Sequence, residues 1–233
     1  MKKILFIATL MVAALSANAQ YDPGTWTIQP RYGVSITGMK DAPPIDILPD
    51  GSSQDTQFAG GNFFGFDIEY QISSHFSMSV GLNRYMAGTG WEDHKWTDTD
   101  EGIDYEMTQM KLETKYISAP VMANVYLYKG LAIHGGVQFD YLIGAKMKGI
   151  IESESDGWDV DTHIQRGVKS SLEKFDVSIP VGISYEFENH IVLDARYNIG
   201  LLKVNKEDKE VEDMTKDIFN RGLTLTSGYK FEL

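Results

Sequence analysis

The chain has 233 residues, a formal net charge of −12 and no cysteine. So acidic a chain repels nucleic acid, and without cysteine no disulfide can stabilise the fold. The length suits one domain of ordinary size, and a single β-barrel could use all of it.

Residues 1–19 have the pattern of a secretory signal. Lys2 and Lys3 precede an apolar run from Ile4 to Leu15, and Ala17-Asn18-Ala19 has the small-x-small form that signal peptidase cuts. No later stretch approaches the roughly 20 apolar residues that a membrane-spanning helix needs. We therefore expect cleavage before Gln20 and an exported domain over residues 20–233, which could cross a membrane only with strands.

Apolar and polar residues alternate with a period of two through most of this domain, which predicts strands with one apolar and one polar face. In the sixth segment, for example, Phe175, Val177 and Ile179 alternate with Asp176 and Ser178. Eight such strands are predicted, at about residues 26–37, 64–72, 76–83, 116–127, 131–146, 175–187, 191–202 and 223–233.

The connections alternate between long and short. The long ones, at about residues 38–61, 88–111, 147–171 and 204–219, are expected to be polar loops, and two of them are strongly acidic. In an antiparallel up-and-down barrel this alternation places every short turn at one end, together with both termini, as in outer-membrane barrels. Pro120 and Pro180 fall inside predicted strands, where we expect local bulges because proline cannot donate to the ladder.

The period alone does not say which face meets lipid, because a soluble barrel of lipocalin type has the same alternation with its apolar face inward. Two features favour lipid outside. The chain ends on Tyr229, Phe231 and Leu233, which resemble the terminal strand by which the barrel-assembly machinery recognises its clients. The apolar face also carries aromatic residues near strand ends, as an interfacial girdle would, namely Tyr70, Phe76, Tyr141, Phe175, Tyr185, Phe187, Tyr229 and Phe231. The predicted fold is all-β, an eight-stranded antiparallel up-and-down transmembrane β-barrel in the outer membrane.

The polar face then becomes the lumen. An eight-stranded barrel is only wide enough for its own side chains, so charged residues of both signs should pack together and close it. We interpret this set as a structural network rather than a pore or a catalytic site; its members are Arg31, Asp67, Glu69, His134, Asp140, Asp176, Asp194, Arg196 and Lys230.

Several stretches resemble the PorT-like outer-membrane β-barrel proteins of Bacteroidota: residues 69–72, 76–82, 116–121, 135–138 and 141–146, together with a signal ending in Ala19-Gln20. The resemblance implies an eight-stranded outer-membrane barrel and carries over no catalytic residue. PorT itself is linked to type IX secretion, a link not shown for most members of the family.

Neither an enzyme nor a cofactor is expected. Of the five histidines only His134 lies in a predicted strand, so a catalytic site would need loops to assemble it. A calcium loop beginning at Glu152 fails because His163 stands where a bidentate glutamate is required, and no metal site is predicted. Trp91, Trp96 and Trp158 lie in the long connections, where they could contact a partner or pack against the barrel rim.

The functional hypothesis is an integral outer-membrane barrel with a closed lumen and a structural or interaction role through its outer loops. Its expected partners are outer-membrane lipid and lipopolysaccharide, the barrel-assembly machinery, and an extracellular or secretion-system protein. The alternatives are an accessory component of type IX secretion, a narrow channel and, with weaker support, a soluble lipocalin-like binding barrel.

Overall fold

The computed structural model describes residues 21–42, 55–98, 103–155, 158–206 and 217–233. The predicted signal peptide and its cleavage site lie outside these residues. The strands are β1 (Trp26–Lys40), β2 (Thr56–Ser73), β3 (Phe76–Trp91), β4 (His94–Asp98), β5 (Ile103–Tyr128), β6 (Leu131–Ser155), β7 (Trp158–Gly167), β8 (Phe175–Glu186), β9 (Ile191–Lys203), β10 (Phe219–Tyr229) and β11 (Phe231–Glu232), with one 3-10 turn, η1 (Lys169–Ser171). Within the described part of the chain, no helix is long and apolar enough to span a membrane.

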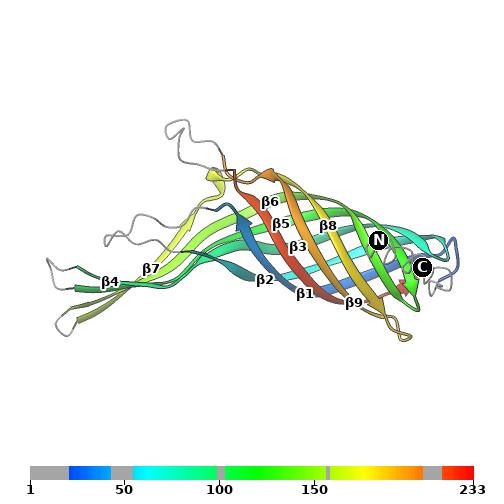
Figure 1. Cartoon of the computed structure of the whole chain (residues 1–233), viewed down its shortest axis with the longest axis horizontal. Coiled ribbons are helices and arrows are strands. Elements are labelled where there is room, and N and C mark those ends of the chain that lie inside the picture. Colours follow the sequence, from blue (N-terminus) through cyan, green and yellow to red (C-terminus); the bar gives the residue numbers. More distant parts are fainter. Residues whose placement is uncertain (1–20, 43–54, 99–102, 156–157, 207–216) are drawn as a thin grey trace, which may run out of the picture.

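Eight strands close into an antiparallel ring. Each pairs with its neighbour in the order β1, β2, β3, β5, β6, β8, β9 and β10, and β10 pairs back onto β1. β11 continues β10 after a break at Lys230 and pairs with Thr27 and Ile28 of β1. The predicted eight-stranded up-and-down barrel is confirmed (Figure 1).

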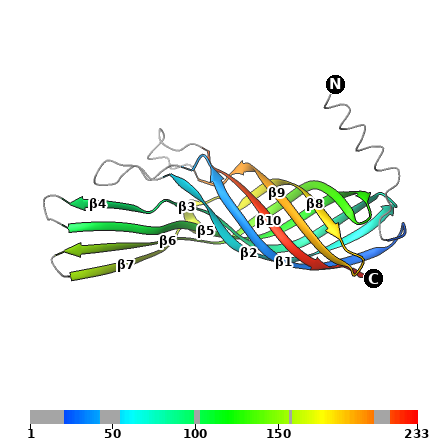
Figure 2. The ribbon, with the colours of Figure 1, turned by 60° about the horizontal axis from the view of Figure 1, so that its bottom comes forward.

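The two ends of the barrel differ. Short turns join β2 to β3, β5 to β6 and β8 to β9 at one end, where the carboxyl terminus also lies (Figures 1 and 2). We call this the short-turn end. The connections that follow β1, β3, β6 and β9 lie at the opposite end, the long-loop end.

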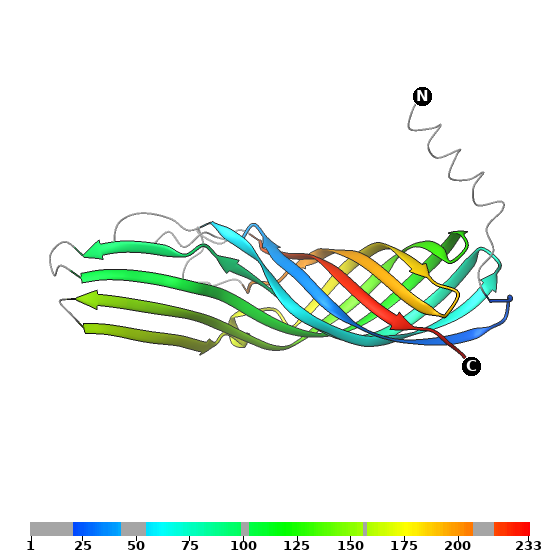
Figure 3. The same ribbon diagram turned by 90° about the horizontal axis from the view of Figure 1, so that it is seen from below.

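Two of the expected loops are largely strand, so that prediction was wrong. β4, residues 103–110 of β5, residues 148–155 of β6 and β7 form a four-stranded antiparallel sheet that projects beyond the ring (Figure 3). We call this sheet the blade. Ile103, Tyr105 and Met107 alternate here with polar residues, so the strand period continues where the sequence is too acidic to face lipid.

The expected bulges at Pro120 and Pro180 are also absent. The register of β3 with β5 is the same on both sides of Pro120, and that of β6 with β8 is the same on both sides of Pro180. The pyrrolidine rings of both prolines are buried and point into the barrel. The register places Gly81 opposite Pro120 and Gly136 opposite Pro180, so a residue without a side chain faces each ring across the gap in the ladder.

The apolar face of the ring points outward. Large apolar side chains such as Val80, Val121, Ile179 and Leu193 are 38–53 % exposed, and similar residues circle the barrel. This is the reverse of a soluble barrel with an apolar lumen. A continuous apolar outer wall of this size suits acyl chains rather than water.

Candidate functional site

The lumen collects all nine residues that the sequence assigns to it. Each is at most 9 % exposed, and all come from the inward-facing positions of ring strands or, for Lys230, from the break between β10 and β11. The inward alternation of each strand therefore brings charges that are far apart in the sequence into one enclosed space.

At the centre of the lumen two arginines neutralise two aspartates. Arg196 Nη2 lies 3.0 Å from Asp67 Oδ2, and Arg196 Nε lies 2.9 Å from Asp194 Oδ1. Arg31 Nη2 contacts Asp67 at 3.1 Å, while its Nη1 is 3.6 Å from Asp194. His134 Nε2 is 3.3 Å from Asp194 Oδ2. These pairs cross-link strands on different sides of the ring, so the lumen is braced from wall to wall.

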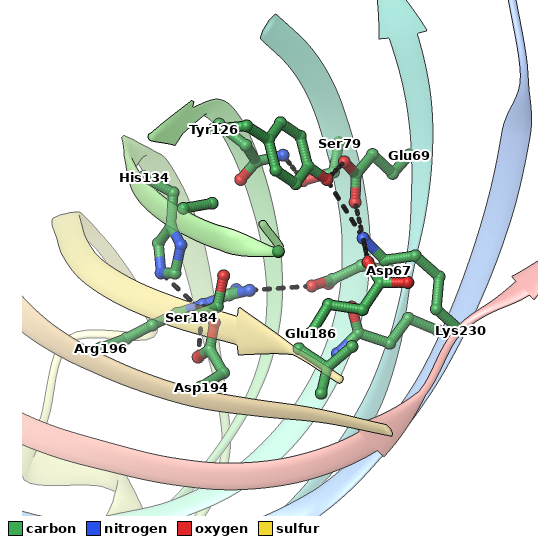
Figure 4. Close-up of a pocket in the computed structure, with 15 residues that line it drawn as sticks. Asp67, Glu69, Ser79, Tyr126, His134, Ser184, Glu186, Asp194, Arg196 and Lys230 are labelled. Carbon is green, nitrogen blue, oxygen red and sulfur yellow. Dashed lines mark hydrogen bonds and ion pairs between the residues drawn. The ribbon is translucent and has the colours of Figure 1, made fainter. Parts of the chain in front are cut away.

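A second group lies nearer the short-turn end, around Lys230 (Figure 4). Its Nζ is 3.0 Å from Glu69 and 3.1 Å from Glu186, and it donates a hydrogen bond of 3.2 Å to the Tyr126 hydroxyl. Tyr126 and Ser77 both donate to Glu69. The predicted lumen set lacks both Glu186 and Tyr126. Glu186 continues the polar alternation of β8, whereas Tyr126 stands in a row of mixed tyrosine, serine and methionine that gives no sign of this role.

Asp140 and Asp176 form a third group nearer the long-loop end and are directly opposite each other on β6 and β8. Asp140 accepts hydrogen bonds from Tyr85, Gln138 and Ser178, and Asp176 accepts one of 2.9 Å from Asn220. Among the described residues, no basic side chain lies within ion-pair distance of either carboxylate. Neutral donors alone stabilise this pair.

An apolar cluster fills the lumen beyond these aspartates. It comprises Met39, Phe63, Tyr85, Ala87, Trp91, Leu112, Tyr116, Leu142, Ala145, Leu172 and Val204. Trp91, one of the three possible contact residues, is 8 % exposed and belongs to this plug. It packs inside the barrel, so a contact role for it does not fit the structure.

Little free volume remains in the lumen. The cavity that Figure 4 shows holds about 20 Å³, room for one water molecule. The charged side chains that line this cavity are bound to one another. The terminal residues Tyr229, Phe231 and Leu233 lie instead on the outer surface at the short-turn end.

The blade carries the second candidate site, an aromatic stack. The ring centroid of Trp96 lies 5.2 Å from that of Tyr105, with an angle of 11° between the rings, and 6.1 Å from that of His94, with an angle of 16°. The three residues share one face because Trp96 pairs with Tyr105 and His94 with Met107. Val160 is paired with Ser153 and is 54 % exposed. The backbone of Trp158 opens β7, and its side chain is not among those described.

The opposite face of the blade is acidic. Glu106 and Glu152 are directly opposite each other on β5 and β6, with Lys95 beside Glu106 on β4. Lys95 Nζ is 2.6 Å from the Glu106 carboxylate, which raises the pKa of Lys95 through a hydrogen bond and through charge. In the described part of the chain, no group of three or more His, Cys, Asp or Glu side chains is placed to hold a metal ion.

Both outer edges of the blade are open. β4 pairs only with β5, and β7 only with β6, among the strands that the structure describes. An edge strand presents unpaired backbone N–H and C=O groups, which a strand from another protein can use.

The model of one protein family, described as "outer membrane protein beta-barrel domain", matches residues 18–205. No curated protein matches the sequence. Similar solved structures include Ail of Yersinia pestis (16 % identity, TM-score 0.38, covering 90 % of this chain and 99 % of Ail). They also include OprG of Pseudomonas aeruginosa (10 %, 0.43, 91 % and 97 %) and the outer membrane protease OmpT of Escherichia coli (13 %, 0.34, 90 % and 94 %). Similarity this low carries no argument about function.

Proposed function

The chain belongs to the outer membrane protein beta-barrel domain family, and from this premise we propose that it is a non-enzymatic interaction protein. In this proposal the closed barrel anchors the chain in the outer membrane and holds the blade outside the cell, where the blade binds a protein partner. Outer-membrane barrels place short turns in the periplasm and longer connections outside, which supports this orientation. The family match covers most of the chain, and the PorT-like resemblance and the signal cleavage before Gln20 remain finer predictions.

The observation that carries the proposal is the blade itself. β5 and β6 have 26 and 25 residues, about twice what a tilted strand needs to cross a membrane. Their excess length builds a sheet with a stacked Trp96–Tyr105 face and two open edges. Trp96 and Tyr105 are half-buried in this face. Aromatic residues supply large contact area at low entropic cost, and they dominate binding energy at protein interfaces.

The barrel contributes an anchor rather than a reaction in this proposal. Most of its buried charges are paired with one another, the Asp140–Asp176 pair is held by neutral donors, and an apolar plug lies on the long-loop side of them. A role as an accessory component of secretion is the finer alternative, and it would appear as a secretion-system protein bound at the blade. The terminal residues Tyr229, Phe231 and Leu233 are proposed to engage the barrel-assembly machinery during insertion.

Photo-crosslinking in intact cells tests the proposal. A crosslinking amino acid in place of Val160, exposed on β7, should form an adduct with a protein partner, whereas the same residue in place of the lipid-facing Val121 should not. Replacing Trp96 and Tyr105 together by alanine should lower the adduct yield at position 160 by roughly tenfold or more.

Trp26→Ala provides the control, because Trp26 also packs against a tyrosine, Tyr70, with ring centroids 4.7 Å apart, but at the short-turn end. It should leave the adduct unchanged. Equal adduct yields with and without the Trp96–Tyr105 pair, or the same adduct from position 121, would refute the blade as the binding surface.

A further inference from the structure

The apolar outer wall of the barrel ends in basic residues at the long-loop end. On each ring strand we follow the outward-facing residues from the short-turn end towards the long-loop end. The first charged residue met in this way is basic on six of the eight strands. We call this set the basic collar: Lys40 on β1, Arg84 on β3, Lys115 on β5, Lys146 on β6, Lys203 on β9 and Arg221 on β10. The other two ring strands have no basic residue at this level: β2 has Asn62, and Glu173 stands just before β8.

Three collar residues lie on adjacent strands as diagonal neighbours. Arg84 pairs with Ile117, and Lys115 lies two residues further along β5 on the same face. Lys115 pairs with Gly144, and Lys146 lies two residues further along β6. Diagonal neighbours in an antiparallel sheet are about 7–8 Å apart, so the three cationic side chains can converge on one group.

Lys146 faces Glu113 across the β5–β6 ladder, but none of the three cations forms an ion pair with a described carboxylate. The nearby carboxylate, Glu113, is already bound by Lys111 at 3.2 Å and by Lys148 at 2.7 Å. Among the described residues, no carboxylate lies within ion-pair distance of Arg84, Lys115 or Lys146. Like charges at this spacing repel one another. An anion between them, other than the described carboxylates, would remove this repulsion.

The position of the group tells what the anion is attached to. Leu82, Ile117 and Tyr141 are 41–50 % exposed and lie next to the group on the side of the apolar wall. The guanidinium of Arg84 lies 5.6 Å from the ring centroid of Phe64, itself part of that wall. At the short-turn end the wall instead ends in exposed aromatic residues such as Trp26, Tyr128 and Phe231. The three cations border the apolar wall, and they do so only at the long-loop end. An anion that is joined to acyl chains and is present only on that side of the membrane fits both observations.

We propose that Arg84, Lys115 and Lys146 bind the phosphate groups of the outer-leaflet glycolipid, lipopolysaccharide, while its acyl chains pack on the apolar wall below. Arginine binds phosphate through two parallel hydrogen bonds, and lysine contributes a mobile point charge. This inference rests on the orientation in the proposed function, with the blade outside the cell. The collar then fixes the depth of the barrel in the membrane.

The test titrates the purified, folded full-length chain with lipid A in an uncharged detergent and measures bound lipid by native mass spectrometry. The triple variant Arg84→Gln, Lys115→Gln, Lys146→Gln should bind lipid A about 10- to 100-fold more weakly. A matched control, Lys95→Gln, Lys129→Gln, Lys206→Gln, removes the same charge from the blade, a short turn and a loop, and should bind as the unaltered chain does. Equal binding by the two variants would overturn the proposal.

Two arms with the unaltered chain identify the ligand even if the triple variant does not fold. Dephosphorylated lipid A should bind the unaltered chain about 10- to 100-fold more weakly than lipid A does, and undiminished binding would overturn a phosphate site. Excess inorganic phosphate should not displace lipid A, and displacement would instead assign the site to free phosphate.

The orientation is tested separately with Val160→Cys, because the chain has no cysteine of its own. A membrane-impermeant maleimide should label this thiol in intact cells. Labelling without phosphate-dependent lipid binding would overturn this inference alone. Absence of labelling would overturn the proposed function.

Discussion

Arg196 on β9 donates a hydrogen bond of 3.0 Å to Asp67 on β2, two residues that are 129 positions apart in the chain. Two ring strands, β1 and β10, separate β9 from β2, so this bond spans the lumen rather than a ladder. It belongs to a buried group of two arginines and two aspartates whose charges balance.

Removing one member of this group should be costly. Arg196→Ala would leave Asp67 and Asp194 with Arg31 as the one arginine between them, inside a closed lumen. We expect a loss of about 3–5 kcal/mol in the free energy of unfolding, measured by urea titration of the protein in detergent. Lys95→Ala breaks the exposed Lys95–Glu106 pair and should leave the unfolding midpoint unchanged. Equal effects of the two substitutions would contradict a bracing role for the lumen.

At the Asp140–Asp176 pair we expect a substitution to raise the free energy of unfolding rather than lower it. Asp176→Asn removes one of two facing charges and keeps an oxygen that can accept from Asn220. Because no described basic residue neutralises this pair, the variant should be more stable by roughly 1–3 kcal/mol. The same urea titration measures it. A destabilised Asp176→Asn barrel would mean that a cation occupies this position in the native protein.

Gly81 should tolerate no side chain. A Cβ at this position would lie 2.1 Å from Asp67 Oδ1 and 3.1 Å from Pro120 Cγ, whereas one at Gly60 would meet nothing within 4 Å. We expect Gly81→Ala to lower the free energy of unfolding by about 1–3 kcal/mol. Gly60→Ala, on the same β2–β3 pair of strands, serves as the control. The measurement is the temperature at which each variant changes its migration on a denaturing gel. Equal temperatures for Gly81→Ala and Gly60→Ala would show that the structure around Gly81 relaxes to accept the side chain.

The barrel should not conduct ions. The charged groups and the apolar plug occupy successive levels of the lumen, and the enclosed cavity at the charged level holds only about 20 Å³. In planar bilayers we expect no steady current steps from the purified chain. Reproducible steps that persist after further purification would favour the narrow-channel alternative. Substituting the plug residue Tyr116 by alanine would then be expected to change their size.

Periodicity in the sequence predicts most of the ring. Each of the eight predicted strands coincides with a ring strand over most of its length, and the polar face named from alternation is buried in the lumen. These predictions work because a strand places successive side chains on opposite faces whatever it pairs with.

The blade shows where that local rule is misread. The period of two continues through Tyr105 and Met107, but acidic residues occupy the other face, and the lack of an apolar wall suggested loops. Pro120 and Pro180 show a related error, because the sequence does not reveal that a glycine on the neighbouring strand faces each ring. The sequence allows Trp91 either to pack against the barrel or to contact a partner. Only its place inside the apolar plug shows that it packs.

The sequence by itself therefore determined the strands, their two faces and the export of the domain that the family match supports. The tertiary structure decided which charges meet, that the lumen is closed by both ion pairs and an apolar plug, and that β5 and β6 continue into a blade. Alternation is a property of one strand and can be read from neighbouring residues. Ion pairs such as Arg196–Asp67 depend on ring closure and register, which join residues that no local pattern connects.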